Sequence, residues 1–274
     1  MINNNIVFSE DGQGNEIVIV GKGIGFRGQK GEELDTSKVE KIFTLKDQKE
    51  KDHFMLMVGE IPYEVISFGL RVADYIAACC SKNIDKRHLL LPLVDHIYTT
   101  LERYKQGIHL EGNVLWNIRY LYQEEYKIGL DVADMMISAF GLPIAEEEAN
   151  YITLHIINAE LDLDPQDGYK ATAIIEIAVN TVEEHFGIRL DRESADFVRF
   201  ITHLQFFAKR MIKNTFWDEG EDEISRLVRY QYKKAYECTK QIIGKLEEKY
   251  HIKVEESEYT YLTIHIARLL KASE

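Results

Sequence analysis

Histidines recur at matching positions in two halves of this sequence. The segment GLPIAEEEANYITLHIINAE aligns without gaps on HIKVEESEYTYLTIHIARLL further along the chain, which pairs His155 with His265. Upstream of these segments, LVDHIYTTLER aligns on FITHLQFFAKR and pairs His96 with His203. The four matched imidazoles are therefore our candidates for a shared chemical task. The remaining histidines have no counterpart; they are His53, His88, His109, His185 and His251.

An imidazole can ligate a metal, act as a general acid or base, titrate near neutral pH, or accept a phosphoryl group on a ring nitrogen. Metal sites usually draw on closely spaced ligands, such as two histidines four residues apart. Here the matched histidines lie about 60 residues apart in each half. A four-histidine metalloenzyme therefore stays only as an alternative, and phosphoryl acceptance and pH sensing stay open.

Sequence motifs for catalysis are missing. No histidine is followed by aspartate, and no Gly-x-Ser-x-Gly or Gly-x-x-x-x-Gly-Lys pattern occurs. Gly21-Lys22-Gly23-Ile24-Gly25 is rich in glycine, but no helical pattern directly follows it. We therefore predict that the protein is not an enzyme and uses no metal or cofactor.

The histidines lie in segments that predict amphipathic helices. Beyond residue 60, apolar residues recur at spacings of three and four, which is typical of helices that pack in a bundle. The offset between the two halves suits a duplicated domain and is too long for a solenoid repeat. We predict two related all-α helical bundles at 61–167 and 168–274. Further identical pairs are Glu146/Glu256, Glu148/Glu258, Tyr151/Tyr261, Thr153/Thr263 and Arg103/Arg210.

The N-terminal part predicts a different fold. Residues 1–47 contain seven of the 17 glycines, no histidine, and short β-branched runs at Ile6–Phe8, Ile17–Val20 and Ile42–Phe43. Turn-forming residues separate these runs, so we predict a small antiparallel sheet over 1–50 and a charged linker over 51–60. So small a sheet rarely supplies a sufficient core, and we expect it to pair with a second copy in a homodimer.

The composition limits the possible partners. The formal net charge is −13, with 46 acidic against 33 basic residues, so nonspecific attraction to nucleic acids or anionic membranes is disfavoured. No apolar run is long enough to cross a bilayer, and no signal peptide is visible at the N-terminus. We expect a cytoplasmic protein whose nucleic-acid binding, if any, is local and dependent on shape.

The ordered motifs of the chain resemble the BglG/SacY/LicT family of transcriptional antiterminators. INNNIV, GKGIGF and KVEKIF resemble that family's RNA-binding domain. DHI, EEYKIGLDVA and LHIINAE resemble its first regulatory domain, and HLQFFAKR, AYEC and YLTIHIARLL resemble its second. The likeness covers almost the whole chain.

The resemblance implies a function and its partners. A dimeric β domain would hold an RNA hairpin that overlaps a terminator, so that polymerase reads on into a sugar-utilisation operon. HPr or a sugar-specific permease component of the sugar phosphotransferase system would phosphorylate His96, His155, His203 and His265.

The resemblance also assigns separate roles to particular residues. RNA contact falls on Asn5, Gly21, Lys22 and Phe26. By analogy with the family, the second regulatory domain would activate and the first would inhibit when sugar is absent.

The strongest alternative is a DNA-binding transcriptional activator with the same kind of regulatory domains. Such proteins usually need a helix-turn-helix, and the β-rich segment 1–47 leaves no room for that three-helix unit. The inducing sugar and the target operon depend on partners encoded elsewhere, so neither composition nor motifs specify them.

Overall fold

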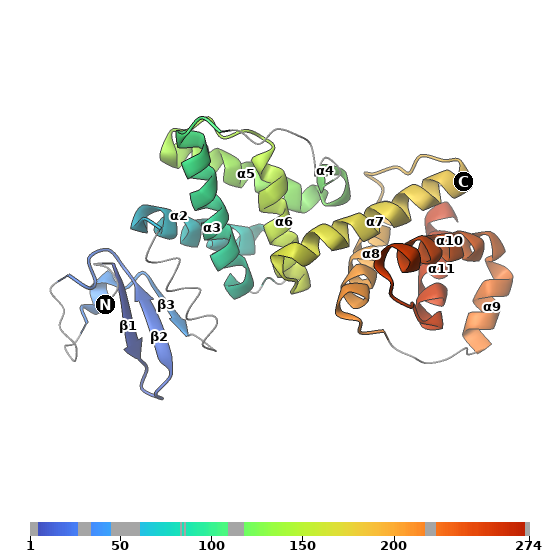
Figure 1. The fold of residues 1–274 in the computed structure, drawn as a ribbon, viewed down its shortest axis with the longest axis horizontal. Coiled ribbons are helices and arrows are strands. Elements are labelled where there is room, and N and C mark those ends of the chain that lie inside the picture. The colour runs from blue at the N-terminus through green and yellow to red at the C-terminus, as the bar shows by residue number, and fades with distance from the viewer. Residues whose placement is uncertain are drawn as a thin grey trace. The chain divides into compact units, whose positions relative to one another are not determined.

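The computed structural model describes residues 5–26, 34–44, 61–82, 84, 86–108, 118–216 and 223–271. The chain divides into two compact units, drawn together in Figure 1. One unit comprises 1–79 and 86–110, and the other comprises 80–85 and 111–274. The expected linker at 51–60 lies outside the described residues.

A three-stranded antiparallel sheet forms the N-terminal part of the first unit. Its strands are β1 (Ile6–Glu10), β2 (Glu16–Val20) and β3 (Lys41–Thr44), in the order β1-β2-β3. The three β-branched runs of the sequence thus form the predicted strands. Ile17 and Ile19 of β2 alternate with residues on the opposite face and pack with Ile24 in a small core. A short 3-10 helix, η1 (Thr36–Lys38), precedes β3.

Two helices complete the described part of the first unit. They are α2 (Tyr63–Cys79) and α3 (Lys86–Lys105), which pack against each other. A side chain at Gly69 would put its Cβ 2.3 Å from a methyl carbon of Val94, so this glycine lets α2 and α3 approach closely. His96 lies on α3 and is half-buried.

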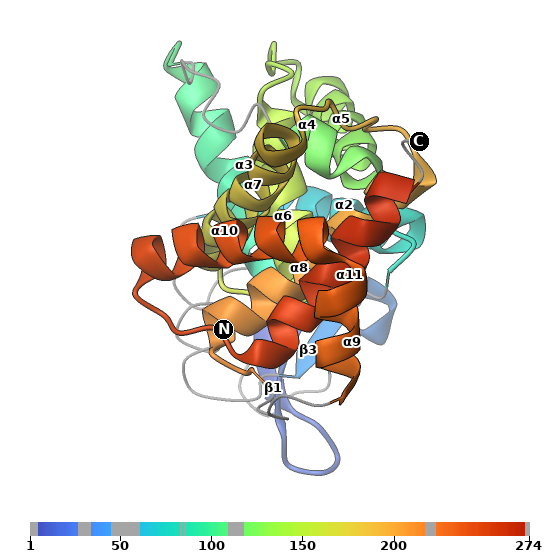
Figure 2. The same cartoon turned by 90° about the vertical axis from the view of Figure 1, so that its right-hand side faces the viewer.

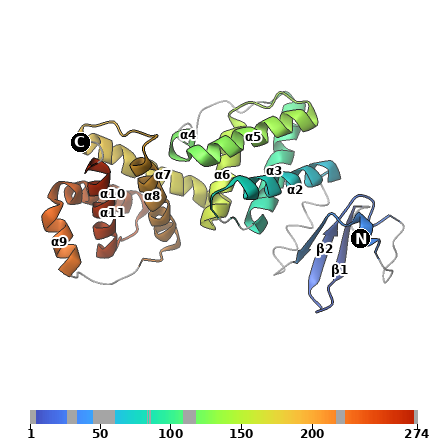
Figure 3. The same cartoon turned by 180° about the vertical axis from the view of Figure 1, so that it is seen from behind.

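The described part of the second unit is helical and continuous in its core. Ile157, Phe200, Ile243 and Leu262 belong to one buried apolar cluster that joins helices from both halves of the sequence. Figures 2 and 3 show these helices from the side and from behind. They are α4 (Ile118–Leu121), α5 (Gln123–Phe140), α6 (Glu148–Leu161), α7 (Pro165–Phe186), α8 (Ala195–Lys213), α9 (Glu223–Gln231), α10 (Lys233–Tyr250) and α11 (Glu256–Lys271).

Helix ends follow from local sequence. α5 ends at Gly141 and α7 at Gly187, both with φ in the left-handed region (67° and 64°) that glycine adopts without a steric penalty. The side chain of Ser194 accepts a hydrogen bond from the backbone N–H of Phe197 and caps the start of α8. The boundary expected between the two halves, at residues 167 and 168, falls in the first turn of α7.

The predicted fold class, a small antiparallel sheet followed by all-α domains, is confirmed. In the described ranges, no helix has the length and apolar character needed to cross a membrane.

Candidate phosphorylation and RNA-binding sites

The second half of the sequence brings its two matched histidines into contact. His203 lies on α8 and His265 on α11, two helices that pack against each other. Their rings are stacked, with centroids 3.5 Å apart and an interplanar angle of 25°. Each histidine precedes a fully buried residue, Leu204 or Ile266, so the helical turn of 100° per residue places both imidazoles at the rim of the core.

A chain of polar contacts leads away from this pair. The hydroxyl of Tyr261 lies 2.8 Å from Nδ1 of His203. The guanidinium of Arg210 lies over the Tyr261 ring, 4.9 Å from its centroid, and Nη2 of Arg210 donates a hydrogen bond of 2.8 Å to the carboxylate of Glu258. Glu258 is 4% exposed, and a second hydrogen bond from Nε of Arg210 makes the pair bidentate.

The surroundings keep both imidazoles uncharged at neutral pH. Burial first, and then the positive charges of Arg199, Arg268 and Arg210, lower the pKa of His203. Burial, the His203 ring and then Arg268 and Arg199 lower the pKa of His265 to about 4. A neutral imidazole keeps a lone pair for nucleophilic attack, and nearby guanidinium groups suit the oxygens of a phosphoryl group. The site therefore has the properties of a phosphoryl acceptor.

The matched histidines of the first half fall in different units. His96 lies on α3 of the first unit, and His155 lies on α6 of the second; both are half-buried. The structure thus brings His203 and His265 into contact, whereas His96 and His155 belong to different units.

All four predicted RNA-contact residues lie at one end of the sheet. Strand register pairs Ile6 with Val20, so Asn5 stands opposite Gly21. The backbone N–H of Gly21 donates to the carbonyl of Asn5 at 2.9 Å, and the N–H of Gly23 donates to the Asn5 side-chain oxygen at 2.7 Å. The Asn5 side chain thus organises the turn that follows β2.

The turn combines a close backbone contact with exposed side chains. A Cβ on Gly21 would lie 1.8 Å from the carbonyl oxygen of Lys38, a distance that excludes any side chain at this position. Lys22 is exposed, and Phe26 is 61% exposed although its ring is apolar. An exposed aromatic ring and an exposed cation at a tight turn are suited to stacking on unpaired bases and to contacting phosphates.

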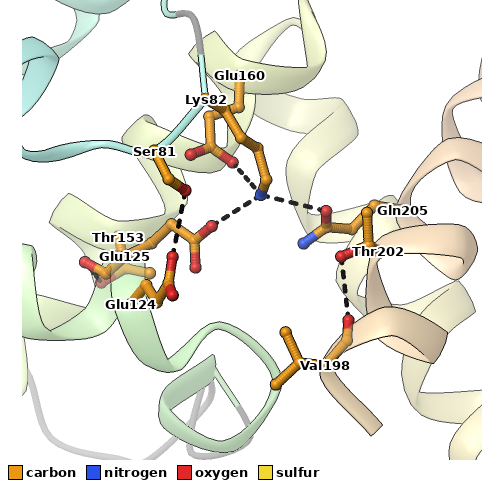
Figure 4. Close-up of polar contacts among 9 residues, drawn as sticks. All are labelled: Ser81, Lys82, Glu124, Glu125, Thr153, Glu160, Val198, Thr202 and Gln205. Carbon is orange, nitrogen blue, oxygen red and sulfur yellow. Dashed lines mark hydrogen bonds and ion pairs between the residues drawn. The ribbon is translucent and has the colours of Figure 1, made fainter. Parts of the chain in front are cut away.

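A lysine with three partners lies elsewhere in the second unit. Nζ of Lys82 lies 2.8 Å from carboxylate oxygens of both Glu125 and Glu160 and 3.4 Å from the amide oxygen of Gln205 (Figure 4). The contacts connect segment 80–85 with α5, α6 and α8. Burial, and next the charge of Glu125, raise the pKa of Glu160 to about 7. Gln205 follows His203 by two residues on α8, so this cluster adjoins the helix of the histidine pair.

Metal ligands do not gather in the described ranges, where no three His, Cys, Asp or Glu side chains converge in a way that would hold a metal ion.

Comparison with known proteins assigns the chain to a family. The CAT RNA binding domain matches residues 1–52, and the PRD domain matches residues 71–159 and again 176–269. Transcription antiterminator LicT of Bacillus subtilis (strain 168) is 33% identical over 271 residues, which cover 99% of this chain and 98% of LicT. The chain belongs to this antiterminator family.

Other members of the family agree with this assignment. The beta-glucoside operon antiterminator of Dickeya chrysanthemi is 30% identical over 98% of this chain and 95% of its own length. A crystal structure of GlcT CAT-PRDI is 31% identical, with a TM-score of 0.50, and the match covers 58% of this chain and 94% of that chain. The family resemblance found in the sequence motifs is confirmed.

The segments that match the two domain families contain the predicted site residues. Asn5, Lys22 and the rest of the turn lie inside the CAT match, His96 and His155 inside the first PRD match, and His203 and His265 inside the second. The chain is therefore an RNA-binding transcription antiterminator with two PRD regulatory domains.

Sequence reasoning missed two groups of residues. Tyr261, Arg210 and Glu258 were visible as identities between the halves, but nothing in the sequence tied them to a role. Lys82 carried no signal, because its partners lie 43, 78 and 123 residues away along the chain.

Proposed function

We propose that this antiterminator binds an RNA hairpin that overlaps a terminator and thereby allows transcription of a sugar-utilisation operon. HPr and a sugar-specific permease component phosphorylate His96, His155, His203 and His265, and this phosphorylation controls RNA binding. The protein works in the cytoplasm as a homodimer and has no enzymatic activity of its own. Its domains are the β domain at 1–50, the linker at 51–60, and PRD domains at 61–167 and 168–274.

The stacked pair of neutral imidazoles, His203 and His265, supports the proposal that phosphorylation controls RNA binding. A phosphoryl group adds about −1.5 to −2 charges and three acceptor oxygens. Placed on a ring whose neighbour lies 3.5 Å away, it changes both the packing and the charge of the contact between α8 and α11. Moving a two-state dimer from mostly inactive to mostly active takes roughly 5.5 kcal/mol of differential stabilisation.

The proposal for RNA binding rests on the turn between β2 and η1. Lys22 and Phe26 are exposed at this turn, Asn5 is half-buried, and Gly21 is buried. The Asn5 side-chain oxygen accepts a hydrogen bond from the backbone N–H of Gly23 and holds the turn in place. Phe26 stacks on an unpaired base, and Lys22 neutralises a phosphate. Two such sheets in a dimer present two copies of this turn to one imperfect RNA hairpin.

The opposite roles proposed for the two PRD domains rest on analogy with the family. Phosphorylation of His203 and His265 by HPr activates, and phosphorylation of His96 and His155 through the permease component inhibits when sugar is absent. The rival DNA-binding activator does not fit a chain whose first 52 residues match an RNA binding domain.

A terminator readthrough assay tests the proposal. The template carries the leader region upstream of the permease or glycosidase gene nearest to this chain's own gene, and the reaction contains the full chain with or without phosphorylated HPr. We expect readthrough to rise with phosphorylated HPr and a His203→Ala/His265→Ala chain to lose that response. Full responsiveness of the double variant, or no complex with the leader hairpin in a gel-shift experiment, would overturn the proposal.

A further inference from the structure

Tyr261 touches both rings of the histidine pair. Its hydroxyl is 2.8 Å from Nδ1 of His203, and its ring stands edge-on to that of His265 with centroids 4.6 Å apart. One turn of α11 separates Tyr261 from His265, so both contacts come from a single rigid helix. The position of the hydroxyl therefore fixes the ring of His203 across the contact between two helices.

Tyr261 is itself held in place. Arg210 lies over its ring, and Arg210 is in turn fixed by the bidentate ion pair with the buried Glu258. Both partners lie on the same two helices as the histidines. The hydroxyl is thus positioned by the protein before any phosphoryl donor arrives.

We propose that Tyr261 positions His203 for phosphoryl transfer, with its hydroxyl occupying Nδ1 so that Nε2 receives the phosphoryl group. This inference rests on the proposed function. Among the described residues, Nδ1 of His203 has the Tyr261 contact, and Nε2 of His203 makes no hydrogen bond. The nitrogen that faces a bound hydroxyl is blocked, and the other keeps its approach open.

The transfer step balances without a further reactant. Nδ1 keeps its proton and donates it in a hydrogen bond to the Tyr261 oxygen, while the lone pair on Nε2 attacks the phosphorus of a donor phosphohistidine. The bond from phosphorus to Nε2 forms as the bond from phosphorus to the donor nitrogen breaks, and the donor ring, protonated on its other nitrogen, leaves with that electron pair as a neutral imidazole. The guanidinium groups of Arg199 and Arg268 stabilise the charge on the transferring oxygens.

The sequence supports a role for this set beyond packing. Every member has the same residue type at the matched position of the first half: Glu148, Arg103, Tyr151, His96 and His155. Apolar core positions tolerate exchange among similar side chains, whereas a hydroxyl, a guanidinium and a carboxylate that recur together indicate a shared task.

Nuclear magnetic resonance of the full chain labelled with ¹⁵N-histidine tests the proposal in two steps. Before phosphorylation, we expect His203 to carry its proton on Nδ1 in the parent chain and to lose that preference in Tyr261→Phe. After incubation with phosphorylated HPr, we expect phosphate on Nε2 of His203. The initial rate in Tyr261→Phe should fall by about two- to tenfold, the factor that loss of one neutral hydrogen bond produces.

Tyr259→Phe is the matched control, because Tyr259 lies on the same helix and contacts Tyr236 instead of the histidines. It should leave the tautomer, the modified nitrogen and the rate as in the parent chain. Phosphate on Nδ1 of His203 in the parent chain overturns the inference even if Tyr261→Phe does not fold, and so does a Tyr261→Phe chain that behaves like Tyr259→Phe. Absence of phosphate from all four matched histidines instead contradicts the proposed function itself.

Discussion

At the scale of single residues, the charge state of His265 links the candidate site to stability. Its pKa is lowered to about 4, chiefly by burial and then by the adjoining His203 ring. Between the ordinary histidine pKa of about 6.5 and pH 4, the unfolded chain takes up a proton that the folded chain refuses. His265 therefore makes the free energy of unfolding fall as the pH falls through this window.

Substitution of His265 by glutamine should remove that acid sensitivity. On lowering the pH from 7 to 4.5, we expect the parent chain to lose about 1 to 2 kcal/mol more than His265→Gln, a value discounted for the half-exposed position of the ring. Urea unfolding followed by circular dichroism at both pH values measures the difference. His251→Asn, which removes an exposed imidazole outside the pair, is the control. Parallel losses in parent and His265→Gln chains would contradict the lowered pKa.

Gly21 is a residue whose identity is dictated by a neighbouring backbone. Because a Cβ here would meet the Lys38 carbonyl oxygen at 1.8 Å, Gly21→Ala should displace η1 from the turn and destabilise the sheet by about 2 to 3 kcal/mol. Gly12→Ala is the control, since its Cβ would have open space around it and its φ is not left-handed. Amide hydrogen exchange in β1 and β2 should accelerate in Gly21→Ala alone. Equal protection in both variants would show that this contact does not restrict the residue.

At the scale of elements, the Lys82 cluster joins helices that the sequence does not relate. One ammonium group offsets one carboxylate, so the buried Glu160 beside Glu125 retains its proton up to a pKa of about 7. Between pH 4.5 and 7 the folded chain therefore holds a proton that the unfolded chain has released. The free energy of unfolding falls as the pH rises through that window.

Glu160→Gln keeps the shape of the side chain and removes the titration. Relative to this variant, the parent chain should lose about 2 to 3 kcal/mol between pH 4.5 and pH 7.5, in the direction opposite to the effect of His265. Thermal unfolding across this pH range measures the difference. Glu184→Gln, at an exposed carboxylate paired with Lys245 at 3.1 Å, should shift stability by less than about 1 kcal/mol at either pH. A Glu160→Gln chain with the pH profile of Glu184→Gln would refute the raised pKa.

The sequence predicted the elements better than the contacts between them. β-branched runs at Ile17–Val20 and helix-ending Gly141 and Gly187 are local signals, because strand pairing and helix capping depend on neighbouring residues. The pairing of His203 with His265 was suggested by duplication alone, and their stacking depends on how α8 meets α11. The contacts of Lys82 come from three helices and depend on tertiary packing, which no local pattern of residues predicts.

At the scale of the whole molecule, the charge works against RNA binding. The chain has a net charge of −13, and residues 1–47 carry eight acidic against six basic side chains. Binding then depends on few phosphate contacts and on the shape of the turn, whereas proteins with 6 to 10 phosphate contacts have correspondingly steep salt dependence. We expect a shallow dependence of affinity on salt, with a slope of log K against log salt between about −2 and −4.

Lys22 is an exposed cation in the described part of the turn, and its removal should change that slope by a defined amount. If its ammonium neutralises one phosphate, Lys22→Ala lowers the magnitude of the slope by about 0.7 to 0.9 and weakens different RNA sequences alike. Fluorescence anisotropy with the leader hairpin at 50 to 300 mM salt, an interval of about sixfold, gives both slopes. Lys105→Ala, in an ion pair with Glu102 on α3, should keep the parent slope. A Lys22→Ala chain that binds more weakly with an unchanged slope would show that Lys22 contacts a base and not a phosphate. Recognition by Lys22 would then depend on a base contact and not on charge neutralisation.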